Sequence, residues 1–183
     1  MMNDNYIKME KNNTTYDEIE PRSQIDVMMR TTVQKNTALS SMADQKANIL
    51  TASSFILLTV LVSRYSELPE LATEILVLLV FICISITFSL ISLFPISKND
   101  KLKKTNWLFF GDYNNTSYDD YRENMIDIMK SDSKTYDTLL LEIYQSGVVL
   151  GNKFKFIRWS YTSLMSGFVV FLIMIIINRV ILN

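Results

Sequence analysis

Three long runs of apolar residues divide the chain, and each is close to the length of a membrane-spanning helix. They occupy residues 47–63, 75–96 and 159–183. A helix needs about 20 predominantly apolar residues to cross about 30 Å of hydrocarbon, so the pattern predicts three transmembrane helices. Asp44 and Lys46 immediately precede the first run. Because charges are costly at the bilayer centre and tolerated at its edge, these two residues mark the depth at which the first helix enters lipid.

Polar segments with helical periodicity adjoin the first and third runs. Apolar residues recur at helical spacing over residues 23–46, with Ser23 or Asp26 as the expected N-cap. No Gly or Pro lies between this segment and the first run, so a single helix is expected from residue 23 to residue 63. A second periodic segment begins at Lys134 and continues without a proline into the third run. The sequence therefore predicts two long helices that extend out of the membrane.

The remaining polar part is an insert of residues 97–158, between the second and third runs. Its residues 117–120 resemble a capping box and predict the start of a shorter helix that ends near Ser131, where Asp132 and Ser133 break it. Residues 1–22 lack apolar periodicity and are expected to form a disordered tail. The predicted fold class is an all-α membrane protein with three transmembrane helices and a cytoplasmic helical bundle, formed by the helix extensions and the insert.

Composition supports this architecture and excludes several kinds of site. The 183 residues include only four Gly and three Pro, which favours long helices over a turn-rich β fold. The chain has no His, and its one cysteine, Cys83, lies in an apolar run. Disulfides, Cys/His zinc sites and His-dependent catalytic triads are therefore excluded. No nucleophile with a base is evident, so we expect the protein not to be an enzyme and to need no cofactor.

The distribution of Lys and Arg predicts the orientation in the membrane. Six of the 18 basic residues precede the first span and ten lie between the second and third spans, whereas the loop of residues 64–74 holds one. The positive-inside rule therefore places the N-terminus and residues 97–158 in the cytoplasm and the 64–74 loop outside. Three spans alone cannot enclose a conducting path, so a homo-oligomer is expected.

Small residues follow one face of two spans. Ser85, Ser89 and Ser92 share a face of the second span, and Ala52, Thr59 and Ser63 share a face of the first. Such faces favour helix–helix contacts, and a polar pore lining is the alternative. Gly147 and Gly151, four residues apart, predict a close approach of a neighbouring helix. No ionisable residue lies in the middle of a span, which disfavours a proton-coupled transporter or ion pump.

Several short motifs occur in a fixed order around the spans. They are Ala43-Asp44-Gln45-Lys46-Ala47, the aromatic block of residues 106–110, the acidic helix start Tyr118-Asp119-Asp120-Tyr121, and Ile143-Tyr144 followed by residues 150–154 and Trp159-Ser160-Tyr161. Together they resemble the transmembrane effectors of the bacterial Pycsar anti-phage systems, over roughly residues 30–177. The resemblance implies an effector in the bacterial inner membrane that is gated by a cyclic nucleotide, cyclic UMP or cyclic CMP, from a partner cyclase. On infection such an effector impairs the membrane and stops growth. No nucleic acid polymer is expected as a partner.

A cyclic nucleotide presents a phosphate, a ribose and a base, so its site needs a cation, polar groups and an aromatic or apolar wall. The cytoplasmic half supplies eight candidates: Asp44, Lys46, Asn106, Phe110, Tyr144, Asn152, Lys153 and Arg158. Trp107 is a further possible wall. For Asp44 and Lys46, an ion pair between helices, with Lys153, Arg158 or Asp137, is at least as good an interpretation as ligand contact. A structural or assembly subunit of a membrane complex remains the alternative function.

Overall fold

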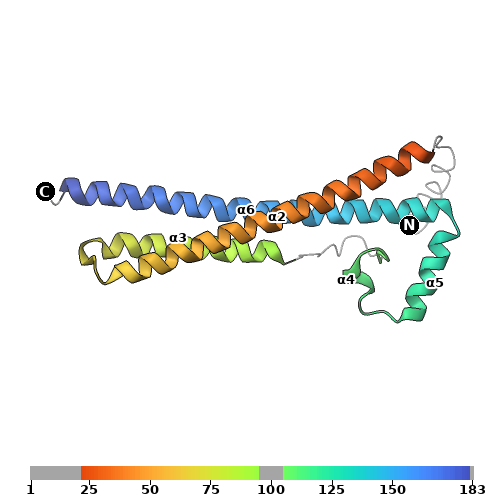
Figure 1. Cartoon of the computed structure of the whole chain (residues 1–183), viewed down its shortest axis with the longest axis horizontal. Helices are drawn as coiled ribbons and strands as arrows, with labels where there is room; N and C mark the ends of the chain where they lie inside the picture. The colour runs from red at the N-terminus through yellow and green to blue at the C-terminus, as the bar shows by residue number, and fades with distance from the viewer. Residues whose placement is uncertain (1–21, 95–104, 182–183) are drawn as a thin grey trace, which may run out of the picture. The chain divides into compact units, whose positions relative to one another are not determined.

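The computed structural model describes residues 22–94 and 105–181. Six elements follow one another: α2 (Arg22–Tyr65), the 3-10 helix η1 (Pro69–Leu71), α3 (Ala72–Leu93), α4 (Phe110–Tyr113), α5 (Tyr118–Met129) and α6 (Asp132–Ile181) (Figure 1). No strand occurs in these two ranges. Three segments, Ser23–Tyr65, Pro69–Leu93 and Asp132–Val180, are long and apolar enough to cross a membrane. The all-α class with three such helices is confirmed.

Two of the helices are much longer than a membrane is thick. α2 has 44 residues and α6 has 50. At 1.5 Å per residue these lengths are about 66 Å and about 75 Å, against about 30 Å of hydrocarbon. The two long helices predicted from the sequence are therefore confirmed. α2 begins at Arg22, so Ser23 and Asp26 lie inside the helix and the expected N-cap was wrong.

The predicted tail, apart from Arg22, and the basic run that opens the insert lie outside the described residues. α3 ends where the backbone of Phe94 becomes extended, and Phe94 precedes Pro95. This is expected, because a proline disfavours the helical conformation of the residue before it. η1 carries Pro69 at its first position, where the missing N–H group costs no hydrogen bond.

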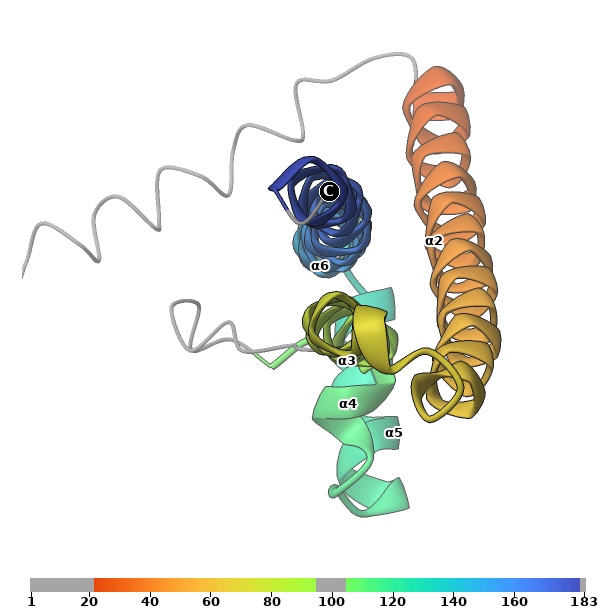
Figure 2. The same ribbon diagram turned by 90° about the vertical axis from the view of Figure 1, so that its left-hand side faces the viewer.

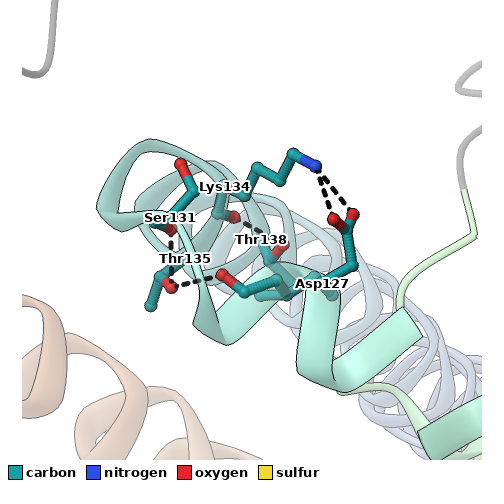
Figure 3. Close-up of polar contacts among 6 residues, drawn as sticks. Asp127, Ser131, Lys134, Thr135 and Thr138 are labelled. Carbon is teal, nitrogen blue, oxygen red and sulfur yellow. Dashed lines mark hydrogen bonds and ion pairs between the residues drawn. The ribbon is translucent and has the colours of Figure 1, made fainter. Parts of the chain in front are cut away.

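Side-chain hydrogen bonds hold both ends of α5. α5 starts, as predicted, with Ser117 as its N-cap: the N–H of Asp120 donates to Ser117 Oγ (3.2 Å), and that hydroxyl donates to the Asp120 carboxylate (2.7 Å). At the other end, the Thr135 hydroxyl lies 3.0 Å from the carbonyl oxygens of both Ile128 and Ser131 (Figure 3).

An ion pair spans the corner between α5 and α6, from Lys134 to Asp127 at 2.7 Å (Figure 3). Asp132 and Ser133 already belong to α6, so they begin the second helix rather than break the first. Short polar side chains favour helix N-termini, which explains the difference.

The chain divides into two compact units, each described by itself. Among the described residues, unit 1 comprises 22–37 and 105–148, and unit 2 comprises 38–94 and 149–181. Within unit 1, α2 and α6 are joined by polar contacts. Asn36 Nδ2 donates to Ser146 Oγ (3.0 Å), and the Tyr136 hydroxyl donates to the Asp26 carboxylate (2.8 Å).

Within unit 2, α3 runs antiparallel to both α2 and α6 (Figure 1), and Figure 2 shows α3 and α6 nearly end-on. Ser89 of α3 accepts from Thr51 of α2 (2.8 Å), and Ser163 of α6 donates to the carbonyl oxygen of Phe81 (3.1 Å). Between them Leu78, Ile82 and Ile86 form a buried cluster against leucines and phenylalanines of α2 and α6. Lipid is as apolar as these side chains, so their close packing and the hydroxyl contacts hold the spans together.

The serine face of the second span lies in helix–helix contacts, as predicted: Ser85, Ser89 and Ser92 are all buried. The corresponding prediction for the first span is wrong within this chain. Thr59 and Ser63 are exposed and each donates to a carbonyl of its own helix.

The predicted close approach at Gly147 and Gly151 is also wrong within this chain, because a Cβ atom at either would meet nothing within 4 Å. The close approach occurs instead at Gly167 of α6. A Cβ atom there would lie 2.5 Å from Cβ of Phe81 on α3.

Candidate functional site

An ion pair joins α2 to α6 at the predicted inner edge of the membrane. Lys153 Nζ lies 2.7 Å from one carboxylate oxygen of Asp44 and 2.9 Å from the other, and it also donates to Ser40 Oγ (3.0 Å). The Lys153 side chain is 11% exposed and that of Asp44 is 39% exposed. A largely enclosed ammonium group needs such partners, because an unpaired buried charge is strongly unfavourable. The pair therefore holds the two helices at a defined register.

Small residues bring the helices together beside this pair. Ala43 and Ala47 of α2 are fully buried against Ile157 of α6, with Phe154 and Leu93 packed around them. Ala43 and Ala47 are four residues apart, so they share the face of α2 that meets α6. Lys46 is exposed and its Nζ lies 5.9 Å from the centre of the Phe154 ring, at the outer limit of a cation–π contact. One anion, two cations and an aromatic ring thus meet at this junction.

A second polar cluster lies in unit 1, where the loop before α4 meets α6. Asn106 is fully buried. Its Nδ2 donates to Glu142 Oε2 (2.7 Å) and to Gln145 Oε1 (2.8 Å), while its Oδ1 accepts from the N–H of Leu108 (3.0 Å). The N–H of Asn106 donates to Asp112 (2.8 Å). Every polar atom of this side chain is engaged, so Asn106 fastens the loop to α6.

Aromatic rings pack beside this loop. The ring of Tyr121 on α5 lies 6.3 Å from that of Trp107 and 5.0 Å from that of Tyr113, measured between centroids. All three side chains are half-buried. Tilted aromatic pairs at these distances attract one another, so the three rings form a small core for unit 1.

Most of the chain matches one known protein family. A family model described as the Pycsar effector protein domain matches residues 28–178, which hold all of α3, α4 and α5 and most of α2 and α6. The chain belongs to this family. This Pycsar effector is therefore a membrane effector of anti-phage defence. Comparisons with curated proteins and with solved structures give no match.

The eight residues predicted to bind ligand in this Pycsar effector fall into both units. Asp44 and Lys153 are in direct contact, so the ion-pair interpretation of Asp44 is confirmed. Of the other three in unit 2, Lys46 lies over Phe154, Asn152 is half-buried and Arg158 is exposed. In unit 1, Asn106 binds Gln145, next to the exposed Tyr144, and Phe110 is the first residue of α4. Ligand binding by these residues stays a prediction.

Sequence reasoning missed four side chains of these clusters: Ser40, Asp112, Glu142 and Gln145. Two of them carried a readable signal. Glu142 and Gln145 are three residues apart on one face of an otherwise apolar stretch. Polar residues at that spacing indicate a common partner.

A cleft of about 720 Å³ lies at the other end of unit 2. It is lined by residues 67–71 of the α2–α3 connection and by Ile175, Asn178 and Arg179 of α6. Asn178 donates to the buried carboxylate of Glu74 (2.9 Å). None of the eight predicted ligand residues lines this cleft, so it is distinct from the Asp44–Lys153 junction.

Proposed function

We propose that this Pycsar effector is gated by a cyclic pyrimidine mononucleotide, cyclic UMP or cyclic CMP, produced by a partner cyclase. On binding it, the effector impairs the integrity of the bacterial inner membrane and stops growth. The observation that carries this proposal is the family match over residues 28–178 of a chain with three helices of membrane length. The proposal gives the chain no catalytic step and no cofactor, in keeping with a sequence without His. The effector acts as a homo-oligomer in contact with membrane lipids.

The Asp44–Lys153 pair supports the proposal chemically. The Asp44 carboxylate lies on a lysine that is only 11% exposed and holds a further hydrogen bond to Ser40. A cyclic nucleotide carries one phosphate charge and competes for the same ammonium group. Lys46 and Arg158 lie on the same stretches of α2 and α6 and add positive charge for the phosphate. Binding thus exchanges an intramolecular anion for a ligand anion.

Such an exchange alters the contact between two helices that each continue into a predicted span. The junction lies at residues 40–47 of α2 and 153–158 of α6, and neither helix is interrupted before its predicted span. A change in register or tilt at the junction therefore reaches the membrane without a separate transmission element. A differential affinity of about 3 to 5 kcal/mol between the two arrangements turns a mostly closed population into a mostly open one.

Two alanine variants and one control test the proposal. Lys46→Ala and Arg158→Ala remove cations at the junction, whereas Arg179→Ala removes a cation of α6 at the distant cleft. Full-length protein in lipid nanodiscs is titrated calorimetrically with cyclic UMP, cyclic CMP and cyclic AMP. Membrane potential is followed by a dye in cells that carry the cyclase. We expect Lys46→Ala and Arg158→Ala to lose pyrimidine nucleotide binding and depolarisation while inserting normally, and Arg179→Ala to keep both.

The opposite pattern contradicts the proposal. If Lys46→Ala and Arg158→Ala keep the nucleotide affinity and the toxicity of the unmodified protein, the ligand site lies elsewhere. If none of the three nucleotides binds the unmodified protein, gating by a cyclic mononucleotide is wrong.

A further inference from the structure

Hydroxyl groups meet between the helices of unit 2 over about one helical turn, near the predicted cytoplasmic ends of the three spans. Ser85 of α3 and Ser160 of α6 are both fully buried. Each donates to the other's carbonyl oxygen, at 2.9 Å and 2.6 Å. Ser89, toward the C-terminal end of α3, accepts from Thr51 and donates to the carbonyl oxygen of Ala47 on α2, at 2.8 Å and 2.9 Å. Side chains of all three helices thus contribute hydroxyls that bond across helix boundaries.

Hydroxyls on the outer faces of the same helices behave differently. Thr59, Ser63, Thr87, Thr162 and Ser166 are exposed, and each donates to a carbonyl of its own helix three or four residues earlier. A hydroxyl that bonds to a carbonyl of its own helix can face lipid without needing a partner on another helix. The outer faces otherwise present apolar side chains such as Ile56, Val80 and Val169. The outer surfaces are therefore suited to lipid, and the hydroxyl groups between the helices are not.

Ser54 of α2 indicates that water is a ligand for these hydroxyl groups. It is fully buried, and its hydroxyl has no hydrogen-bond partner among the residues that the structure describes. α2 and α3 are antiparallel and Thr51 meets Ser89, so one turn further along α2 brings Ser54 to the level of Ser85. A buried hydroxyl without a partner can still form a hydrogen bond, and water forms that bond where it has access.

We propose that water and monovalent ions enter between the helices from the cytoplasmic side through this hydroxyl seam, Thr51, Ser54, Ser85, Ser89 and Ser160, when the effector is active. The inference rests on the proposed function, since it locates the cytoplasmic entrance of the path by which the membrane is impaired. In the conformation described here the seam is closed by its own cross-helix hydrogen bonds. When the helices separate, each lost hydrogen bond is replaced by one to water, whereas parting the apolar faces offers water no such partner.

The single natural cysteine provides a matched control for testing the seam. Cys83 is exposed, two residues before Ser85 on the same helix. At 3.6 residues per turn the two side chains point about 200° apart, at depths that differ by about 3 Å. Ser85→Cys in a Cys83→Ser background therefore reports on the seam, and the unmodified protein reports on the lipid-facing side at nearly the same depth.

The first measurement uses purified full-length protein in liposomes, with cyclic UMP or cyclic CMP as the probe and a charged, membrane-impermeant methanethiosulfonate as the thiol reagent. We expect either nucleotide to speed modification of Ser85→Cys by roughly tenfold or more, since the reactive thiolate forms in water and not in lipid. Cys83 should stay unmodified. Equal rates at the two positions, while the nucleotide releases an entrapped dye, would overturn the seam as the entrance to the path.

The second measurement needs no nucleotide. Ser85→Asp places a charge in the seam and favours its hydrated state, whereas Thr87→Asp places the same charge on the exposed face. We expect dye release without nucleotide from Ser85→Asp and none from Thr87→Asp. Ser89→Asp gives the same reading if Ser85→Asp does not insert. If the seam variants leak but the unmodified protein does not respond to either nucleotide, the path is supported and the proposed gating is contradicted. Failure of the path and failure of the proposed gating are therefore distinguishable. No leakage from either seam variant would overturn the path.

Discussion

Lys153 and Asp44 differ in how far they are shielded from solvent. The lysine side chain is 11% exposed and the aspartate 39% exposed, although they form one ion pair. Removing the carboxylate leaves an enclosed ammonium group whose remaining hydrogen bond among the described residues is to Ser40, whereas removing the lysine leaves a carboxylate that water can reach. The two single substitutions are therefore not equivalent.

We predict that Asp44→Asn lowers the free energy of unfolding by about 1 to 3 kcal/mol, the cost of an enclosed charge without its partner. Lys153→Met should cost less, because its stem is replaced by an apolar chain and Asp44 can be hydrated. Thermal denaturation of purified protein in detergent measures the order. The exchanged pair Asp44→Lys with Lys153→Asp should recover most of the loss, and failure to do so would show that the pair contributes little to stability. If the ligand phosphate competes with Asp44, Asp44→Asn also binds cyclic UMP or cyclic CMP more tightly.

The sequence predicted the importance of single residues better than it predicted which residues form pairs. Asp44 and Lys153 could be singled out because each is a charge beside an apolar run. Their contact joins positions 109 residues apart, so the sequence left several partners open. Gly167 shows the same limit. Its closeness to Phe81 depends on how α3 and α6 cross, whereas the regular spacing of Gly147 and Gly151 drew attention to two positions with open space.

Among the elements, the loop before α4 depends on one side chain. Asn106 uses its amide group to donate to Glu142 and Gln145, and its carbonyl oxygen to accept from Leu108. An amide can do both, and a carboxylate can only accept. Asn106 is thus replaceable neither by Asp nor by an apolar residue without loss of these contacts.

We predict that Asn106→Asp releases this loop, because it sets a second carboxylate against Glu142 where a hydrogen bond of 2.7 Å was. Hydrogen–deuterium exchange followed by mass spectrometry should show faster exchange over residues 105–117, with the membrane-length helices unchanged. Adding Glu142→Gln restores a donor and should slow the exchange again. Unchanged exchange in Asn106→Asp would mean that the aromatic rings of Trp107, Tyr113 and Tyr121 alone hold the loop.

Local elements were predictable where their signals are local. The N-cap at Ser117 and the uninterrupted course of α2 and α6 follow from neighbouring residues, and all three are present. The corner after α5 was predicted about two residues too late, because Asp132 and Ser133 suit the start of a helix as well as its end. The attachment of Asn106 to α6 was not predictable, because its partners Glu142 and Gln145 lie 36 and 39 positions further along the chain.

For the molecule as a whole, orientation in the membrane is the property on which the proposed function depends. A nucleotide made in the cytoplasm reaches the Asp44–Lys153 junction only if that end of α2 and α6 faces the cytoplasm. The distribution of Lys and Arg in the sequence predicts this orientation.

We predict that cysteines introduced at Ser66 and Asn115 label oppositely in a Cys83→Ser background. Both positions are exposed, Ser66 just after α2 and Asn115 between α4 and α5. A membrane-impermeant maleimide applied to intact cells should modify Ser66→Cys only, and both variants should react after lysis. Equal labelling in intact cells would contradict the three-span topology.

The closed corner between α5 and α6 has a consequence for proteolysis. Lys130 and Lys134 are both exposed there, each a position after which trypsin cleaves. Trypsin binds its substrates in an extended conformation, yet Lys130 has helical backbone angles and its N–H group is bonded to the carbonyl oxygen of Ile126. The Thr135 hydroxyl and the Lys134–Asp127 ion pair hold the adjoining turn, so cleavage requires local unfolding of both helix ends. The corner should therefore resist trypsin despite its two exposed lysines. Cleavage there would show that the corner has unfolded locally.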